Sequence, residues 1–384
     1  MRYLSSHHLQ FQNVASAYIS SKINKMKILI DINHPAHVHY FRNFIKEMEK
    51  DGYEFIVTNR DSEIINQLLD FYNINHHIRK PRPKKKPRLR SLSYLLSMIW
   101  DVYKVARKKR PDFFIGFASP ACAINAALFR KPSVIIDDTE HNHLNHSIYS
   151  KFCSVILTPH FFEKDMGKKQ IRFQAYIEQF YLHSKYFKPT KILKEDKYAL
   201  IRYISYNASH DHNVKNIATE EKKIELVSRL SKKMKVYVST ESEIVENSFF
   251  NNFKLKIHPS EMHSVIANAT IFITEGATMA SEAGVLGTPY YYINPLSVGN
   301  INHQEKKYEH AHSSTTDKVI NNINHLNLGK DLSINGTIEN STINPTEFLI
   351  LFVKNYSELK IQLKNKIVDH EVFREISSIS KIDN

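Results

Sequence analysis

Short apolar runs alternate with longer amphipathic segments over most of this chain. Residues 27–32 read KILIDI and predict a buried strand, and residues 38–50 place Val38, Phe41 and Phe44 on one face of a helix. Further strands are expected at residues 53–58, 73–78, 112–116, 133–137 and 154–157. Because predicted helices separate these strands, the pattern indicates an α/β fold built on a doubly wound parallel sheet.

The same alternation begins again near residue 198. Strands are expected at residues 198–205, 235–239, 253–257, 271–274 and 290–293. The stretch between the two runs, residues 181–196, holds Pro189, mixed charge and no strong period, which favours a domain boundary there. The pattern therefore predicts two Rossmann-like domains, at residues 26–185 and 186–345.

The two ends of the chain fit neither run. Residues 1–25 have no clear period and no apolar core of the kind that a secretory signal needs, so we expect them to lie outside the fold. Residues 346–384 predict a helix followed by a tail that frays beyond residue 369.

Composition is typical of a soluble globular protein. The chain has 384 residues, of which 42% are hydrophobic and 24% are charged. Its longest apolar stretch, near residues 92–100, is too short to span a bilayer. Its two cysteines, Cys122 and Cys153, provide neither a disulfide framework nor a metal site. These features predict a cytoplasmic protein.

A formal net charge of +14 favours anionic partners. Residues 79–90, RKPRPKKKPRLR, concentrate positive charge before a predicted helix and could rest on the anionic inner face of the cell membrane. The alternative is an ordinary solvated loop. Nucleic-acid binding is the alternative from another functional class. The basic residues are not interleaved with a recognition element, so we expect no nucleic-acid partner.

Residues 271–289, IFITEGATMASEAGVLGTP, combine a strand, a turn of small residues and a helix. The turn and the helix start comprise Glu275, Gly276, Ala277, Thr278 and Met279. Their backbone N–H groups and the positive end of the helix could hold a diphosphate. Glu282, one helical turn further on, could accept hydrogen bonds from ribose hydroxyls. The alternative is an ordinary βα unit whose small residues only permit close packing.

Polar residues also follow other predicted strands, at the edge where ligands of a doubly wound sheet bind. His34 and His37 come directly after the first strand, and either could take a proton from a sugar hydroxyl as a general base. Either histidine could instead cap the helix that follows. His39 already lies within that helix, and we expect a structural role for it.

The loop at residues 137–143, DDTEHNH, follows the fifth strand. Its acidic and histidine side chains are of the kinds that bind metals, but no cysteine is present to complete a site. We favour acceptor binding or the orientation of a catalytic histidine, with Asp138, Glu140 and His141 as candidates. No metal and no cofactor are predicted.

The first strand of the second domain ends in a further polar loop. Candidates for binding phosphates or sugar there are Asn207, Ser209, His210 and Asp211. Arg202, on the strand itself, could offset the charge of a leaving diphosphate. The alternative for Arg202 is an inward-facing pair with a carboxylate. Residues 294–302 give a weaker signal of the same kind.

Several of these segments resemble known families. Residues 275–289 are similar to the donor-binding segment of GT-B glycosyltransferases and of non-hydrolysing UDP-N-acetylglucosamine 2-epimerases. Residues 26–41, MKILIDINHPAHVHYF, resemble the opening of an epimerase-related family of prokaryotic GT-B proteins of unknown function. The segments DDTEH, LTP, GKKQIR and NASHD resemble later parts of that family in the same order. Asn33 stands where the family is expected to have glycine, and Glu275-Gly276 replaces an Asp-Ser type pair.

The resemblance, which reaches from residue 26 to the region of residue 310, implies the GT-B architecture, in which two Rossmann-like domains enclose a cleft. GT-B enzymes generally act without a bound metal. Together with the residues above, the resemblance predicts inverting transfer of a sugar from a nucleotide diphosphate donor, with UDP favoured. The acceptor would be a carbohydrate or a lipid-linked molecule in surface polysaccharide biosynthesis, and His37 or His34 would be the base. The main alternative is a non-hydrolysing nucleotide-sugar 2-epimerase, for which residues 137–140 could supply acid and base.

Overall fold

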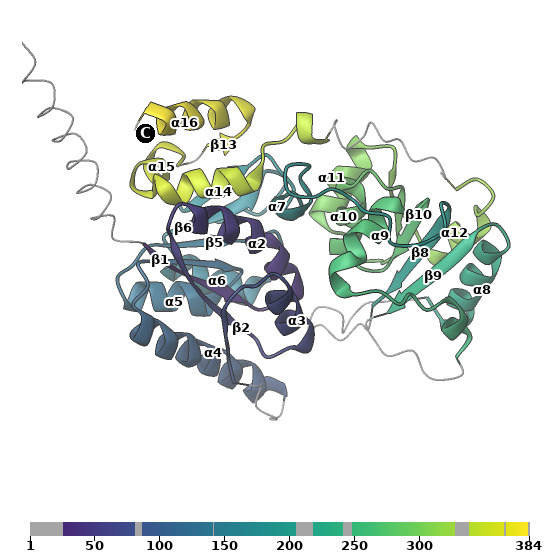
Figure 1. Cartoon of the computed structure of the whole chain (residues 1–384), viewed down its shortest axis with the longest axis horizontal. Coiled ribbons are helices and arrows are strands. Elements are labelled where there is room, and N and C mark those ends of the chain that lie inside the picture. The colour runs from purple at the N-terminus through teal and green to yellow at the C-terminus, as the bar shows by residue number, and fades with distance from the viewer. Residues whose placement is uncertain are drawn as a thin grey trace, which may run out of the picture.

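The computed structural model describes residues 26–80, 87–140, 142–204, 218–240, 248–326, 338–364 and 366–382. These residues build two α/β domains that lie side by side, each with a parallel sheet between layers of helices (Figure 1). The fold class predicted from the sequence, with two doubly wound Rossmann-like domains, is confirmed.

The first sheet takes strands from both ends of the described chain. The first domain contains, in chain order, β1 (Lys27–Ile32), α2 (Pro35–Lys50), β2 (Glu54–Asn59), α3 (Glu63–Phe71), β3 (His76–Ile78), α4 (Pro87–Lys109), β4 (Phe113–Phe117), α5 (Pro120–Leu128), β5 (Ser133–Ile136), α6 (His143–Phe152), β6 (Val155–Pro159), β7 (Gln170–Phe173) and α7 (Gln179–Leu182). The strand order is β13-β7-β6-β5-β4-β1-β2-β3, and β13 (Ile367–Val368) comes from the C-terminal region.

Successive residues of β1 point to opposite faces of this sheet, which explains its two helix layers. Ile28 and Ile30 pack in a core with α2, where Phe41 and Phe44 are fully buried, as the periodicity predicted. Leu29 faces the other way, into a core with α4 and α5. Apolar residues on both faces are what a parallel sheet covered on both sides requires.

The second sheet is smaller and has the strand order β12-β11-β10-β8-β9. The second domain contains, in chain order, β8 (Tyr198–Tyr203), α8 (Glu220–Ser231), β9 (Lys235–Thr240), η1 (Phe249–Phe253), η2 (Pro259–Glu261), α9 (Met262–Asn268), β10 (Ile271–Thr274), α10 (Ala277–Val285), β11 (Tyr290–Tyr292), α11 (Gly299–Lys307), β12 (Ala311–Ser313) and α12 (Thr316–Asn321). Every strand pair in its sheet is parallel.

Two expectations from the sequence are wrong. Residues 253–257 do not form a strand, because the 3-10 helix η1 occupies the start of this stretch and only an isolated bridge joins Lys254 to Val238. The three phenylalanines of η1 pack against the core of the second domain, which holds the segment in a helical turn. The tail also does not fray beyond residue 369, since it forms α16 (His370–Ile382).

After residue 338 the chain returns to the first domain. There α14 (Pro345–Lys354) packs on α2 and α7, and α15 (Tyr356–Gln362) and α16 lie beside it, as Figure 1 shows. Phe348, Leu349 and Phe352 of α14 are fully buried. β13 then adds a strand beside β7. The end of the chain therefore completes both the first sheet and the helix layer on one of its faces.

Candidate functional site

Loops and helix starts at the carboxyl ends of the two sheets face each other across the domain boundary. The His39 ring in α2 lies 4.7 Å from the His263 ring in α9, measured between ring centroids. The Glu140 carboxylate, after β5, has atoms 3.2 to 3.5 Å from the position that a Cβ atom on Gly299 would occupy at the start of α11. Ligands of open α/β sheets bind at this edge. The candidate site is therefore built from these facing segments.

The turn from β10 into α10 presents backbone donors for which the described part of the chain supplies no acceptor. Gly276 is the N-cap residue, with φ −92° and ψ 119°, and its N–H donates to Thr274 Oγ1 at 2.9 Å. The Ala280 N–H is the first in the helix to find a backbone acceptor, the Gly276 carbonyl oxygen. Among the described residues no side chain caps this helix or accepts from the N–H groups of residues 277–279. With the helix dipole, these groups can bind an anion.

Packing does not require glycine at position 276. A Cβ atom there would meet its nearest neighbours, Ile204 Cγ2 and Thr274 Oγ1, at 3.5 Å, which is ordinary contact. Gly284, in the same helix, differs, because a Cβ there would lie 1.9 Å from Oε1 of the buried Gln304. Close packing therefore requires a glycine at position 284 but not at position 276.

Glu275 fixes the geometry of this turn. Its Oε2 atom accepts the Ile204 N–H at 3.0 Å, and its Oε1 atom lies 2.9 Å from Lys223 Nζ. Asn294, in the loop after β11, donates to the Glu275 carbonyl oxygen at 2.9 Å. Since Glu275 is buried and paired, it positions the turn, and the helix start presents the donors.

Glu282 connects three helices. Its Oε1 atom accepts a hydrogen bond from the Tyr181 hydroxyl at 2.6 Å and lies 3.2 Å from His263 Nε2. Tyr181 belongs to α7, at the end of the first domain, and His263 belongs to α9. The sequence did not suggest these contacts. The expected hydrogen bonds from Glu282 to a ribose stay a prediction.

The two candidate histidines after β1 lie in different environments. His34 is exposed and is the N-cap of α2, where its Nδ1 accepts the Ala36 N–H at 3.2 Å. His37 is buried, and its Nδ1 accepts the Asn33 N–H at 3.3 Å. Burial and then the charge of His34 lower the pKa of His37 well below its usual value. A neutral ring whose Nδ1 accepts carries its proton on Nε2, so His37 is arranged as a hydrogen-bond donor.

Two carboxyl groups with raised pKa values lie between the domains. Burial and then the neighbouring Asp137 carboxylate raise the pKa of Asp138 to about 7. Burial and then the charge of Asp138 raise the pKa of Glu178 to about 8. Glu178 is 1% exposed, and its Oε2 atom has no hydrogen-bond partner in the described part of the chain. Carboxyl groups that titrate near neutral pH can serve as acid and base.

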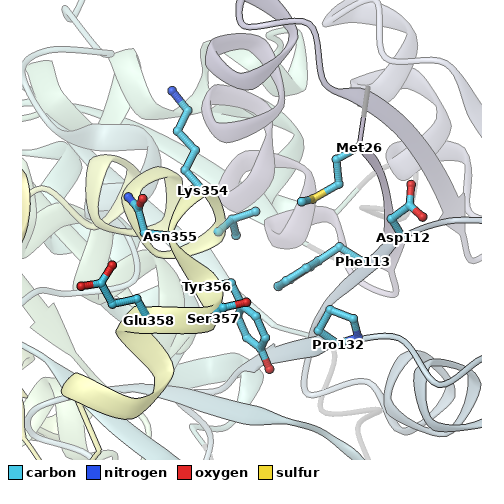
Figure 2. A pocket seen from close by; sticks show the side chains of 10 residues that line it. Met26, Asp112, Phe113, Pro132, Lys354, Asn355, Tyr356, Ser357 and Glu358 are labelled. Atoms are coloured by element: carbon cyan, nitrogen blue, oxygen red, sulfur yellow. The ribbon is translucent and has the colours of Figure 1, made fainter. Parts of the chain in front are cut away.

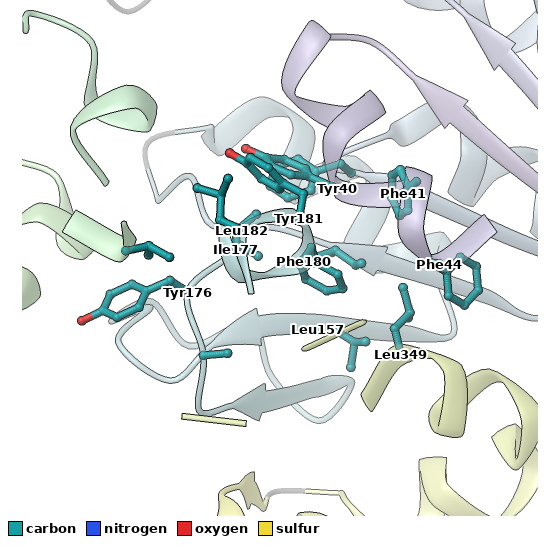
Figure 3. Close-up of a cluster of buried hydrophobic side chains, with 14 of the residues drawn as sticks. Tyr40, Phe41, Phe44, Leu157, Tyr176, Ile177, Phe180, Tyr181, Leu182 and Leu349 are labelled. Carbon is teal, nitrogen blue, oxygen red and sulfur yellow. The ribbon is translucent and has the colours of Figure 1, made fainter. Parts of the chain in front are cut away.

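Tyr40 stacks against His37 and lies close enough to these carboxyl groups for their charges to affect its pKa. Its ring centroid lies 5.8 Å from that of His37 and 5.7 Å from that of Tyr181, and Figure 3 shows the two tyrosine hydroxyls directed the same way. Burial raises the pKa of Tyr40 well above its usual value, and neighbouring carboxylates, Asp138 first, raise it further. Four segments, α2, the loop after β5, α7 and α10, therefore meet around this tyrosine.

The rest of the loop after β5 is held by internal contacts. Asp137 accepts a hydrogen bond from the Tyr149 hydroxyl at 2.6 Å and lies 3.2 Å from His146 Nε2. Glu140 accepts the Glu163 N–H at 2.7 Å. Within the ranges that the structure describes, no group of three His, Cys, Asp or Glu side chains could hold a metal ion.

Arg202 lies at the carboxyl end of β8. Its Nη1 atom donates to Ser239 Oγ at 2.7 Å and to the Thr240 carbonyl oxygen at 3.1 Å, which joins the ends of β8 and β9. The other candidates of this region, Asn207, Ser209, His210 and Asp211, lie outside the described residues, as does His141 after β5. Their roles stay predictions.

The structure thus groups His37, Asp138 and Glu282 around Tyr40, while His34 caps a helix and Glu275 fixes a turn. Sequence reasoning missed Tyr40, Glu178 and Tyr181. One signal was present, because Glu178 is the only charged residue in the mostly apolar and aromatic stretch YIEQFYL. A carboxylate that such a stretch buries has to be paired or protonated.

A cavity of about 320 Å³ lies at the opposite edge of the first sheet (Figure 2). Met26, which precedes β1, Phe113, which begins β4, and Pro132, which precedes β5, line one side of it, and Tyr356 of α15 lines another. These strand residues mark the amino ends of the sheet. Because ligands of open α/β sheets bind at the carboxyl ends, we do not assign this cavity to the site.

Two facing Rossmann-like domains, with a C-terminal segment that returns to the first, define the GT-B class of folds. The chain belongs to the family described as "Protein of unknown function (DUF354)", which matches residues 26–358. The relationship to a GT-B family of unknown function, inferred above by resemblance, is therefore confirmed. The uncharacterized protein MJ0665 of Methanocaldococcus jannaschii is 23% identical in an alignment of 350 residues, which covers 86% of this chain and 98% of that one.

Solved structures share the fold at low sequence identity. The UDP-GlcNAc 2-epimerase from Neisseria meningitidis bound to UDP-GlcNAc has a TM-score of 0.61 and 12% identity, over 86% of this chain and 100% of that chain. The spinosyn forosaminyltransferase SpnP has a TM-score of 0.58 and 12% identity, over 88% and 100% of the two chains. At such identities the likeness concerns the fold alone.

Proposed function

We propose that this protein binds a nucleotide diphosphate sugar at the start of α10 and transfers the sugar, with inversion and without a bound metal, to an acceptor hydroxyl. The observation that carries the proposal is a helix start whose N–H groups have no acceptor among the described residues, preceded by a glycine that packing does not require. A diphosphate close to the backbone would use both features. Proteins of similar fold that bind UDP-GlcNAc or transfer sugars support this choice.

The second domain would stabilise the leaving nucleotide. N–H groups that point at the diphosphate, together with the helix dipole, balance the charge that develops as the bond to the sugar breaks. Glu282 would accept hydrogen bonds from ribose, with its carboxylate held in place by Tyr181 and His263. The acceptor would be a carbohydrate or lipid-linked molecule of surface polysaccharide biosynthesis, on the cytoplasmic side of the membrane.

We assign the general base to Asp138. Its pKa of about 7 lets the carboxylate form exist at neutral pH while it is still basic enough to take a proton from a hydroxyl. His37, the base expected from the sequence, accepts the Asn33 N–H through Nδ1, so its remaining nitrogen carries a proton. His37 would therefore donate a hydrogen bond to the bound sugar or acceptor.

A nucleotide-sugar 2-epimerase is the second candidate. The pair Asp138 and Glu178 favours it, because two interacting carboxyl groups with pKa values of about 7 and about 8 supply a base and an acid in one place. Such an enzyme would need no acceptor.

Incubation with UDP-N-acetylglucosamine separates the two candidates. A transferase releases UDP only when an acceptor is added, whereas an epimerase forms a second UDP-sugar from the donor alone, and anion-exchange chromatography resolves these products. Calorimetric titration with UDP is the accompanying binding measurement. Absence of binding to UDP and to common nucleotide sugars would contradict both candidates.

A further inference from the structure

The helices α4 and α5 lie on the side of the first domain that is across the sheet from α14 (Figure 1). Both helices carry exposed apolar side chains. Leu96 and Trp100 in α4 and Leu128 at the end of α5 are 58%, 56% and 62% exposed. Leu96 and Trp100 are four residues apart and share one face of the helix. Asn125 Nδ2 donates to the Ile99 carbonyl oxygen at 3.0 Å and holds α5 against α4. We name Leu96, Trp100 and Leu128 the α4 patch.

A series of stacked aromatic rings connects Trp100 to the core of the first domain. The Trp100 and Tyr103 rings lie 5.4 Å apart at 14°, and the Tyr103 and Phe129 rings lie 5.4 Å apart at 28°. Phe129 in turn stacks on the fully buried Phe114 at 6.3 Å. Single exposed apolar side chains are normal in a monomer. A half-exposed tryptophan that stacked rings connect to the core is instead a rigid apolar surface that needs no ordering when it binds.

Cations lie at the ends of the two helices that carry the α4 patch. Arg107 and Lys108 lie at the end of α4, and Arg130 follows α5; all three are exposed, and none forms an ion pair with another described residue. Asp101, the acidic residue of α4, is buried and is already paired with Lys104 at 2.7 Å. The surface therefore combines apolar side chains with uncompensated positive charge.

We propose that the α4 patch binds the surface of an anionic lipid bilayer. Leucine and tryptophan side chains gain by entering the boundary between headgroups and acyl chains, while nearby cations are attracted to anionic headgroups. A nucleic acid would use the cations but not the exposed leucines. The contact is peripheral, since none of the described helices is both long enough and apolar enough to cross a membrane.

The position of α4 connects this surface to the candidate site. α4 follows β3, so it begins at the carboxyl edge of the first sheet, where the facing loops lie. The sequence had suggested residues 79–90 for membrane contact, but residues 81–86 lie outside the described ranges. The present proposal rests on α4 and α5 alone, and it does not depend on the reaction that the protein catalyses.

The fluorescence of Trp100 tests the proposal directly, because the chain has one tryptophan. Addition of vesicles that contain phosphatidylglycerol and phosphatidylcholine to the full-length protein should shift the emission to shorter wavelength and protect it from iodide. Vesicles of phosphatidylcholine alone should do so much less. No shift with the anionic vesicles would overturn the proposal, as would a shift that grows with protein concentration in the absence of vesicles, which would indicate contact between copies of the chain.

Variants that keep Trp100 locate the binding surface. Leu96→Ser combined with Leu128→Ser, and separately Arg107→Glu combined with Lys108→Glu, should each weaken co-sedimentation with anionic vesicles about tenfold or more. Ile361→Ser is the matched control, because Ile361 is 70% exposed in α15, away from the patch, and it should bind like the wild type. Equal losses in the control, or unchanged binding in both patch variants with unchanged melting temperatures, would rule out this surface.

Discussion

The turn from β1 to α2 and the turn from β10 to α10 use their polar groups in opposite ways. Near the end of β1, Asp31 accepts hydrogen bonds from Thr58 Oγ1 at 2.8 Å and Ser119 Oγ at 2.7 Å, and after the strand His34 caps the helix. After β10, no described side chain caps the helix, and the N–H groups of residues 277–279 have no described acceptor. The first turn therefore builds the edge of the site from polar groups that have partners, whereas the second turn presents N–H groups that no described residue accepts from and that a ligand could use.

The sequence assigns the catalytic base to the first turn because that turn contains the histidines. The structure favours other groups as the base, since His37 already accepts a backbone N–H, while Asp138, which is half-buried, and Glu178, which is buried, have raised pKa values. Single substitutions can test whether polar groups that already have hydrogen-bond partners are structural and whether those without described partners are functional.

Asp138→Asn should have the largest effect on turnover. Loss of a general base typically lowers the rate about 10²- to 10⁴-fold, and nucleotide affinity should change little, because the second domain holds the donor. The wild-type kcat/KM should rise with pH through about 7, since the active form is the carboxylate. His37→Ala is the comparison, and a larger loss for it than for Asp138→Asn would restore the sequence-based assignment of the base.

Asp31→Ala should mainly affect stability. The carboxylate is fully buried and lies 3.3 Å from Arg79 Nε, so its removal leaves a buried guanidinium without the negative charge that balances it. We expect the free energy of unfolding to fall by about 3–5 kcal/mol in urea denaturation. Asp112→Ala, which breaks a half-exposed pair with Lys131, should cost at most about 1 kcal/mol. Similar costs for the two variants would mean that the first turn does not depend on Asp31.

Ala277→Pro tests the helix start directly. Proline is tolerated at the first helical position, and the extended backbone of Gly276 suits a residue that precedes proline, so the fold should survive. The substitution removes one N–H that a diphosphate would use, which should weaken UDP binding by about 1.5–3 kcal/mol in calorimetric titration. Ala277→Ser keeps the N–H and should bind normally. Unchanged affinity of the proline variant would place the diphosphate elsewhere.

Glu178→Gln should change how stability depends on pH. A carboxyl group whose pKa is raised to about 8 by folding binds a proton more tightly in the folded state than in the unfolded state. Its stabilising contribution is therefore complete below the unfolded pKa of about 4.3 and is lost as the pH rises through about 8. The melting temperature of the wild type should fall over this range, by the equivalent of at least about 1 kcal/mol, and that of Glu178→Gln should fall less. Identical pH profiles would show that Glu178 does not bind this proton.

The sequence predicts the fold better than it predicts the site. Strands such as β1 and β10 are readable because they are runs of apolar residues, and helices such as α2 because burial on one face leaves a repeating pattern. β7 and β12 read QIRF and AHS and lack such a run, and β13 has only two residues. The loops after strands were correctly singled out as polar. Which groups in them stay unsatisfied depends on distant partners: Thr58 and Ser119 lie 27 and 88 residues from Asp31 along the chain. Glu178 likewise has neighbours that are distant along the chain, namely Asp138 in the first domain and Ser281 and Glu282 in the second.

The return of the chain end to the first sheet has a consequence for biosynthesis. The ribosome synthesises β7 long before its partner strand β13. It also synthesises Phe173 long before Phe348, although the two rings lie 5.9 Å apart in the folded protein. The nascent first domain therefore keeps an open strand edge and an uncovered apolar face while the whole second domain is synthesised. A chain that ended near residue 340 would lack the segments that complete the first domain. That domain would therefore be the less stable one, although it is synthesised first.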